Sequence, residues 1–259
     1  MSDYRELSRS VAGLKVFLTG AASGMGRATA RLFAAEGAIV ALSDINGEGS
    51  EAVAKEIRDK GQKAFSWRLD VADASAIKSV VAESAAKLGG LDIIINNAGL
   101  SGRTAIDGEG YEALWEKNIS VLLTSHARII REALPHLRKS PSPRIVNIAS
   151  TEALGATPGI SPYSAAKAGV TGLTRSLAVE LGREGITVNC ICPGPIRTGL
   201  TDRIPEEDKT VYAKRRTALR RYGYPEEVAH MTLSLCLPAA SFLTGAVIPV
   251  DGGLMARNA

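Results

Sequence analysis

A tyrosine and a lysine spaced for one face of a helix are the clearest candidates for chemistry in this sequence. Tyr163 and Lys167 lie four residues apart, just after Pro162 and at the start of a long helical pattern. Residues at positions i and i+4 of a helix share one face. A positive charge beside a phenol lowers its pKa from about 10. We therefore expect Tyr163 to exchange a proton with a substrate oxygen, although an exposed helix face would show the same spacing.

A glycine-rich turn follows the first apolar run and leads directly into a helical pattern. It reads Thr19-Gly-Ala-Ala-Ser-Gly-Met-Gly26. Glycine adopts positive φ and lets a pyrophosphate approach the backbone closely. The helix that begins there directs free N–H groups and the positive end of its dipole at a phosphate. The turn therefore predicts a dinucleotide site that contains Gly20, Ser23, Gly24, Met25 and Gly26.

An acid at the end of the second apolar run indicates which dinucleotide is preferred. Asp44 lies in Ala41-Leu-Ser-Asp-Ile45, close to the distance of about 20 residues at which a carboxylate binds ribose hydroxyls. A carboxylate there repels a 2′-phosphate, and Ser23 offers that phosphate no cation. Both residues favour NAD over NADP. The alternative is that Asp44 is an ordinary acidic residue of a turn.

Short apolar runs alternate with helical patterns along the whole chain. Strands are expected at 15–18, 39–43, 64–69, 92–96, 144–149, 187–191 and 247–250. Helices are expected at 25–36, 48–60, 74–88, 111–139, 163–183 and 225–237. The strands are rich in Val, Ile and Leu with little alternation, as in parallel sheets buried on both faces. We predict one α/β domain over 1–259, a Rossmann fold with a doubly wound parallel sheet of seven strands.

Two segments stand outside this alternation. Residues 1–12 form a polar leader, and residues 194–224 form a long polar excursion that contains no strand pattern. Long excursions inside compact folds are usually functional or mobile. We therefore predict that residues 194–224, the lid segment, are partly helical and cover the substrate. The lid segment carries a basic cluster, Lys214, Arg215, Arg216, Arg220 and Arg221, which could receive an anionic substrate or be a solvated face.

Composition excludes several classes of protein. The chain has 259 residues, 45% of them hydrophobic, and a net charge of +4 from interspersed charges, which gives nucleic-acid binding little support. No apolar run approaches the roughly 18 residues of a membrane span, and the first residues lack the apolar core of a secretory signal.

Three cysteines make no paired framework, so we expect core thiols and a cytoplasmic location. No histidine lies in a metal-ligand motif, and His126 and His136 are expected at a helix surface or interface.

The motifs occur in the order typical of the short-chain dehydrogenase/reductase family, which the chain resembles from about Leu14 to Gly253. The resemblance implies that the coenzyme site continues through Asp44, Ile45, Asp70, Val71, Asn97, Ala98, Gly99, Pro193, Gly194, Ile196 and Thr198. It implies a catalytic tetrad of Asn118, Ser150, Tyr163 and Lys167. Tyr163 and Lys167 would also contact the coenzyme.

The same resemblance implies hydride transfer between NAD and a secondary alcohol or ketone. Tyr163 would be the general base or acid, and Ser150 would donate a hydrogen bond to the reacting oxygen. Lys167 would lower the pKa of the phenol and bind the nicotinamide ribose, while Asn118 would hold a water beside Lys167. Ser101, Glu152 and Leu154 would line the substrate pocket, where Glu152 could accept a bond from a substrate hydroxyl or amine. A solvent-facing Glu152 is the alternative.

Two other functions stay open at this point. One is a 3-oxoacyl-thioester (acyl carrier protein) reductase, a class in which NADP is common, against which Ser23 and Asp44 argue. The other is a coenzyme-binding sensor without catalysis, which would be expected to have lost part of the tetrad. The resemblance also implies a homotetramer, or a homodimer, assembled through the long helices and the last strand.

Overall fold

Seven parallel strands form a single twisted sheet at the centre of the molecule. The computed structural model describes residues 6–257. The strands are β1 (Lys15–Thr19), β2 (Ile39–Asp44), β3 (Ala64–Arg68), β4 (Ile93–Asn96), β5 (Arg144–Ile148), β6 (Thr187–Pro193) and β7 (Val247–Val250). Their order is β3-β2-β1-β4-β5-β6-β7, and all neighbours pair in parallel. The predicted seven-stranded doubly wound Rossmann fold is confirmed.

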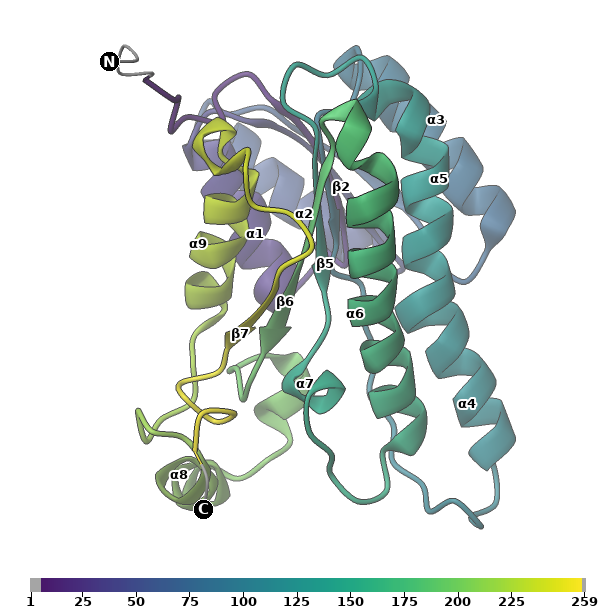
Figure 1. The fold of residues 1–259 in the computed structure, drawn as a ribbon, viewed down its shortest axis with the longest axis vertical. Helices are drawn as coiled ribbons and strands as arrows, with labels where there is room; N and C mark the ends of the chain where they lie inside the picture. The colour runs from purple at the N-terminus through teal and green to yellow at the C-terminus, as the bar shows by residue number, and fades with distance from the viewer. Residues whose placement is uncertain (1–5, 258–259) are drawn as a thin grey trace.

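Helices cover both faces of this sheet (Figure 1). One layer consists of α1 (Gly24–Ala35), α2 (Gly47–Arg58) and α9 (Pro225–Cys236). The other consists of α3 (Ala74–Leu88), α4 (Tyr111–Ile119), α5 (Ser125–Leu137) and α6 (Ser161–Leu181). Three single turns of 3₁₀-helix, η2 (Thr151–Ala153), η3 (Gly182–Glu184) and η4 (Pro238–Ala240), complete the connections. Across residues 6–257, no helix has both the length and the apolarity that a membrane crossing requires.

The strands consist of consecutive apolar residues because helices cover both faces of the sheet. Ile93 and Ile95 of β4 face the core beneath α1 and α9. Ile94 faces the opposite core, beneath α3 and α5. All three are completely buried because successive side chains of a strand point to opposite faces, and both faces are covered here. The strand order reverses between β1 and β4, which leaves a crevice at the carboxyl ends of these strands.

The long helix expected over residues 111–139 contains a π turn. A π-helical turn, η1 (Ser120–Thr124), separates α4 from α5. Just before it, the Nδ2 of Asn118 donates to the carbonyl of Leu114, at 2.7 Å. A side chain that bonds the carbonyl four residues earlier competes with the helix ladder and bends the helix. The expected helical stretch is therefore present from Tyr111 to Leu137, and its π turn begins two residues after Asn118, a predicted site residue. π turns are frequent at functional sites.

The lid segment is partly helical, as predicted. It contains α7 (Gly199–Asp202) and α8 (Glu206–Arg216), which lie below the carboxyl ends of β6 and β7 in Figure 1. A parallel bridge between Ile196 and Gly223 joins its two ends. The leader differs from expectation, because Val11 is 1% exposed and belongs to the core. Residues 1–5 of the leader lie outside the described residues.

Candidate active site

The helical face predicted for Tyr163 and Lys167 is present in the first turns of α6. The helix begins at Ser161, and Pro162 occupies a first-turn position where no intrahelical N–H bond is needed. The Nζ of Lys167 lies 5.8 Å from the centre of the Tyr163 ring. The two side chains therefore face the same side of the helix, directly beside the end of β5.

Lys167 is held in the protein interior rather than at the surface. Its side chain donates from Nζ to the carbonyl of Ile148, the last residue of β5, at 2.7 Å. The residue is 3% exposed. Burial disfavours the ammonium form and lowers the pKa of Lys167 to about 8. The contact with Ile148 fixes the amine at the carboxyl end of β5, two residues before Ser150.

The phenol of Tyr163 has a different electrostatic environment from the one expected. Burial raises the pKa of Tyr163, a hydrogen bond with Ser150 acts in the opposite direction, and the charge of Glu152 raises it further. We expected the charge of Lys167 to lower the pKa of Tyr163. For the chain without a bound coenzyme this expectation was wrong, because the loss of hydration on burial has the larger effect. At neutral pH the phenol of the chain alone carries its proton.

Ser150 and Asn118 are the other two residues of the predicted tetrad, and a hydrogen bond joins Ser150 to Tyr163. Ser150 precedes η2, and its Oγ accepts a hydrogen bond from the N–H of Glu152 at 3.1 Å. Its hydroxyl faces the phenol of Tyr163, with which it forms a hydrogen bond. Asn118 is completely buried, and no donor among residues 6–257 reaches its Oδ1. The four predicted catalytic residues come from α4, the end of β5 and α6.

The glycine turn has a steric requirement for glycine. A Cβ on Gly26 would lie 1.9 Å from the carbonyl oxygen of Gly20, so no other residue fits there. Gly20 has a φ of +69°, which favours glycine. The Nδ2 of Asn97 donates to the carbonyls of Thr19 and Gly20, at 2.9 and 3.1 Å. The end of β4 therefore holds the turn in place.

The helix that follows this turn is suited to an anion. Ser23 precedes α1 but its side chain makes no capping hydrogen bond, and the first turn contains no acidic residue. The first N–H groups of a helix lack intrahelical partners, and its dipole places positive charge there. In α2 and α3, by contrast, Asn46 and Asp73 cap the first turn. The start of α1 thus fits a pyrophosphate.

Asp44 ends β2 and faces the glycine turn. Its Oδ2 accepts from the N–H of Ala22 at 3.0 Å, and its Oδ1 accepts from the N–H of Asn46 at 2.9 Å. The carboxylate therefore holds the turn and also lines the crevice beside it. Both readings of Asp44 that the sequence left open, a turn acid and a ligand for ribose, are compatible with this position.

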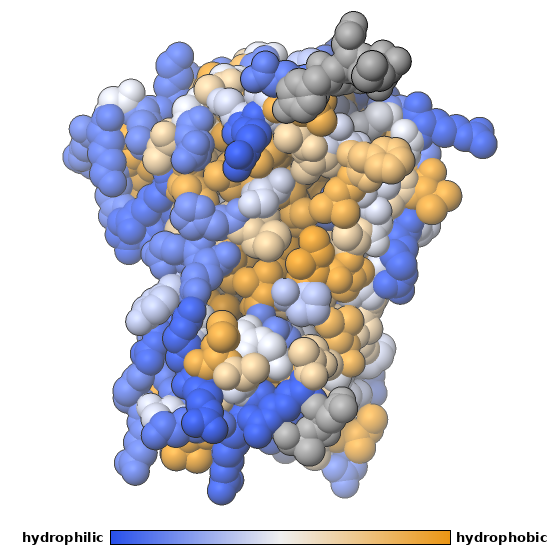
Figure 2. Space-filling view, turned by 60° about the vertical axis from the view of Figure 1, so that its left-hand side comes forward, coloured by the Kyte–Doolittle hydropathy of each residue, from blue (hydrophilic) through white to orange (hydrophobic). Residues whose placement is uncertain are grey.

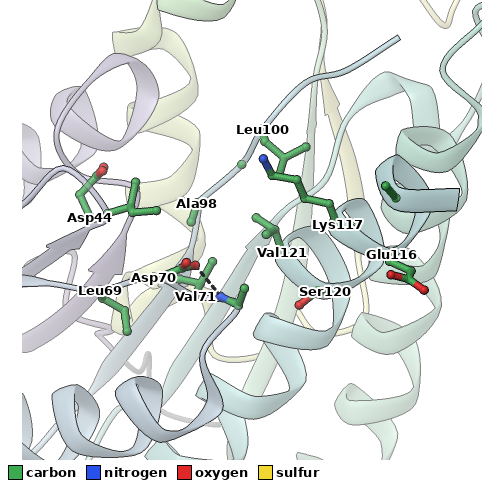
Figure 3. A pocket seen from close by; sticks show the side chains of 15 residues that line it. Asp44, Leu69, Asp70, Val71, Ala98, Leu100, Glu116, Lys117, Ser120 and Val121 are labelled. Carbon is green, nitrogen blue, oxygen red and sulfur yellow. Dashed lines mark hydrogen bonds between the residues drawn. The ribbon is translucent and has the colours of Figure 1, made fainter. Parts of the chain in front are cut away.

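These elements border one groove at the carboxyl ends of the strands, the central groove. Its wider part has a volume of about 650 Å³ and its narrower part about 260 Å³, and both are lined by Gly20, Asp44, Gly99 and Leu100. Figure 3 shows Asp44 and Lys117 on opposite sides of the wider part, with Ala98 between them. A groove at this switch point is where doubly wound sheets bind dinucleotides.

Most of the coenzyme residues expected from the sequence line the central groove. They are Gly20, Ser23, Gly24, Met25, Gly26, Asp44, Ile45, Asp70, Val71, Asn97, Ala98, Gly99, Tyr163, Lys167 and Thr198. Pro193 and Gly194 do not line it. Ile196 is 5% exposed and lines a separate pocket beside Gly223, because its side chain turns towards the core under α9.

One wall of the groove was missed from the sequence. It is formed by Ala113, Glu116, Lys117, Ser120 and Val121. Their spacing of three and four residues does place them on one helix face. Their mixed polarity gives no indication that this face borders a ligand.

His126 also differs from expectation. It lies inside α5 at 2% exposure rather than at a surface, and neither ring nitrogen has a partner among residues 6–257. Burial, assisted by the charge of Lys167, holds the pKa of His126 well below its usual value. Within the described part of the chain, no group of three His, Cys, Asp or Glu side chains is arranged to hold a metal ion.

Comparison with known proteins agrees with this architecture. The profile of the family described as enoyl-(acyl carrier protein) reductase matches residues 20–255. The 3-oxoacyl-[acyl-carrier-protein] reductase of Thermotoga maritima is 39% identical over 243 residues, which cover 94% of this chain and 98% of that protein. The meso-2,3-butanediol dehydrogenase of Serratia marcescens is 40% identical over 248 residues, which cover 94% of this chain and 95% of that protein.

A solved structure extends the agreement to three dimensions. A dehydrogenase/reductase from Sinorhizobium meliloti 1021 superposes with a TM-score of 0.90 at 38% identity, covering 97% of this chain and 98% of that one. The chain belongs to the short-chain dehydrogenase/reductase family. It is an oxidoreductase of the class that acts on CH–OH groups or the corresponding carbonyls, with a nicotinamide coenzyme.

Proposed function

We propose that this protein is an NAD-dependent dehydrogenase of secondary alcohols, or reductase of the matching ketones, with Tyr163 as the general acid/base. The observation that carries the proposal is the meeting of Tyr163, Lys167 and Ser150 at one end of the central groove. The nicotinamide coenzyme supplies the hydride acceptor or donor when it is bound. The chain itself binds and orients the partners and moves the proton.

The proton moves between Tyr163 and the reacting oxygen. In reduction, the phenol, which is protonated at neutral pH, gives its proton to the forming alkoxide. Ser150 donates a hydrogen bond to the same oxygen, where negative charge develops. In oxidation the steps run in reverse, so Tyr163 must lose its proton first. The buried amine of Lys167, and the open Oδ1 of Asn118 with a water, would hold and pass that proton.

The preference for NAD is assigned to Asp44. Replacing it, as in Asp44→Ala, removes the ligand for ribose hydroxyls and the repulsion of a 2′-phosphate. The ratio of kcat/KM with NAD to kcat/KM with NADP should fall by about 10- to 100-fold, since hydrogen bonds to charged groups contribute about 1.5–3 kcal/mol. Steady-state kinetics with both coenzymes measures this ratio.

Asp44 also holds the glycine turn, so a second variant is needed. Asp44→Asn keeps a side-chain acceptor for the turn but removes the charge, and should shift the ratio in the same direction. Asp59→Asn, at the exposed end of α2, is the control and should leave the ratio unchanged. A wild-type protein that already prefers NADP would refute the assignment.

A spectrophotometric screen at the nicotinamide absorbance tests the reaction class. Polyols, hydroxysteroids, hydroxy acids and simple secondary alcohols are assayed with NAD, and the corresponding ketones with NADH. We expect turnover with at least one secondary alcohol or ketone. Absence of turnover throughout, in a folded protein that binds NAD, would instead favour a non-catalytic coenzyme sensor.

A 3-oxoacyl-thioester reductase is the second candidate, and the Thermotoga maritima relative favours it. The basic cluster of the lid segment could receive the anionic carrier of such a substrate. Arg221, however, already forms two hydrogen bonds with Glu227, at 2.7 and 2.6 Å. Lys214, Arg215, Arg216 and Arg220 stay exposed. Acetoacetyl-CoA with NADH and with NADPH belongs in the same screen and distinguishes the two candidates.

Assembly as a homotetramer or homodimer is part of the proposal. Phe242 is completely exposed and Val179 is 83% exposed, although both are large and apolar. Figure 2 shows apolar residues gathered over the middle of the face that turns forward from the side of α9 and β7 in Figure 1. Light scattering measures the number of subunits.

The three cysteines are buried free thiols, which suits the proposed reducing, cytoplasmic location.

A further inference from the structure

His126 is a buried side chain whose two polar atoms are left open. It is the second residue of α5 and is 2% exposed. Neither its Nδ1 nor its Nε2 forms a hydrogen bond with any of residues 6–257. Buried polar atoms are hydrogen-bonded in the great majority of native structures, so two open ring nitrogens on one side chain require a reason.

The packing of α5 places His126 beside the carboxyl end of β4. Ile129 and Ile130, about one turn further along α5, belong to the same core cluster as Ile94 of β4. Because α5 leads from the end of β4 back to the start of the parallel strand β5, it runs antiparallel to both strands. One helical turn rises about 5.4 Å, and two strand residues rise about 6.6 Å. His126 is therefore level with Asn96, whose side chain points to the same face of the sheet as that of Ile94.

Asn96 begins a chain of buried hydrogen bonds that runs in one direction. Its Nδ2 donates to Oδ1 of Asn147 on β5, at 2.9 Å, and Nδ2 of Asn147 donates to Oγ1 of Thr174 on α6, at 3.0 Å. The hydroxyl of Thr174 donates in turn to the carbonyl of Val170, at 2.8 Å. At the start of the chain, Oδ1 of Asn96 is buried and accepts nothing from residues 6–257. A ring N–H of His126 is the donor that would complete the chain.

The other ring nitrogen of His126 is then an acceptor. Burial, assisted by the charge of Lys167, holds the pKa of His126 well below its usual value, so the ring is neutral at neutral pH. A neutral imidazole has one N–H donor and one acceptor nitrogen. Lys167 is the cation that acts on this ring, and its ammonium has three N–H donors, one of which binds the carbonyl of Ile148.

We propose that His126 is a positioning residue for Lys167, with its ring donating to Oδ1 of Asn96 and accepting, through one buried water, from the Lys167 ammonium. No side chain among residues 6–257 bonds the ring directly, and a water that bridges buried polar groups is nearly as good as a direct bond. The chain from Thr174 to Asn96 then fixes the tautomer of His126. The inference rests on the proposed function only for its effect on turnover, since the contacts themselves need neither coenzyme nor substrate.

The groups that face Lys167 determine the direction of the expected change. Burial lowers the pKa of Lys167 to about 8, and the thiols of Cys190 and Cys192 on β6 act in the opposite direction. Tyr163 lies along the same face of α6. On the other side of His126, α3 and β4 contribute apolar side chains to the core that holds α5. Loss of the His126 acceptor removes stabilisation of the ammonium, so the pKa of Lys167 should fall further.

The titration of Lys167 tests this without substrate. The protein is labelled with ¹³C at lysine Cε, and the NMR signal of Lys167 is identified by its absence from Lys167→Met. In His126→Leu the titration midpoint should fall by about one pH unit, as expected for the loss of one hydrogen bond to a charged group. His126→Gln, whose amide can again donate and accept, should keep a midpoint close to that of the wild type. Ser125→Ala is the control, because Ser125 is equally buried in α5 but bonds the carbonyl of Val121 within the helix.

The ring nitrogens of His126 test the direction of the chain. In ¹⁵N NMR of the wild type at pH 7, His126 should show a single neutral tautomer, with one protonated and one unprotonated nitrogen. Thr174→Val removes the hydroxyl that accepts from Asn147, and should populate the second tautomer.

Several results would overturn the inference. They are a doubly protonated His126 or a mixture of tautomers in the wild type, a Thr174→Val spectrum identical to that of the wild type, and an unchanged Lys167 midpoint in a folded His126→Leu protein. The wild-type spectrum decides the question even if a variant does not fold. Absence of turnover with every substrate of the screen would overturn the proposed function instead, and would leave the contact between His126 and Lys167 in place.

Discussion

Tyr163→Phe should reduce kcat by about 10²- to 10⁴-fold, the range for general acid–base catalysis, while NADH binding stays unchanged. The variant loses only the hydroxyl oxygen that exchanges the proton. The ring and its packing beside Lys167 remain, so the fold and the central groove are preserved. Turnover is followed at the nicotinamide absorbance, and NADH binding by coenzyme fluorescence.

A second tyrosine provides a matched control for this prediction. Tyr111 begins α4, and its hydroxyl forms a hydrogen bond of 3.0 Å with Ser161 at the surface. Tyr111→Phe makes the same chemical change outside the site and should leave kcat near the wild-type value. Substantial turnover in a folded Tyr163→Phe protein would remove Tyr163 from the mechanism.

Lys167→Met should change how stability depends on pH. The pKa of Lys167 is lowered to about 8 in the folded protein, against a usual value of 10.5. Below pH 8 both folded and unfolded chains carry the proton, and the folded state bears the whole cost of the buried charge. Between pH 8 and 10.5 the unfolded chain binds more protons, so Lys167 lowers stability less as the pH rises. The free energy of unfolding of Lys167→Met minus that of the wild type should therefore fall by about 2 kcal/mol between pH 7 and 10.

Urea denaturation at both pH values measures this difference. Titrations that both proteins share cancel in the comparison, and the hydrogen bond from Lys167 to Ile148 is missing from the variant at both pH values. Lys60→Met, at an exposed position after α2, is the control and should show no such pH dependence. A relative stability that stays flat from pH 7 to 10 would mean that the amine is not desolvated. The same variant should lose turnover.

The fold could be predicted because its signals are local. Unbroken apolar runs such as Ile93–Ile95 require cover on both faces of a sheet, and the glycines of the turn mark where a strand passes into a helix. The spacing of Tyr163 and Lys167 likewise depends only on helix geometry. For these features, the short-range pattern and the final structure agree.

The failures all depend on contacts between segments that are distant in sequence. The pKa direction of Tyr163 is set by burial, which the pair of residues does not encode. The interior position of His126 depends on how α5 packs. The side chain of Ile196 turns into the core, although the coenzyme motif predicted a groove residue.

The bridge between Ile196 and Gly223 has an evolutionary consequence. The two ends of the lid segment meet there, so the residues between them form a loop that is closed at its base and independent of the strand ladder. Lengthening such a loop costs only about 0.6 kcal/mol for each doubling of its length. Descendants of this protein could therefore exchange α8, which does not line the central groove, for other segments and so acquire new substrates without refolding the part that binds the nucleotide.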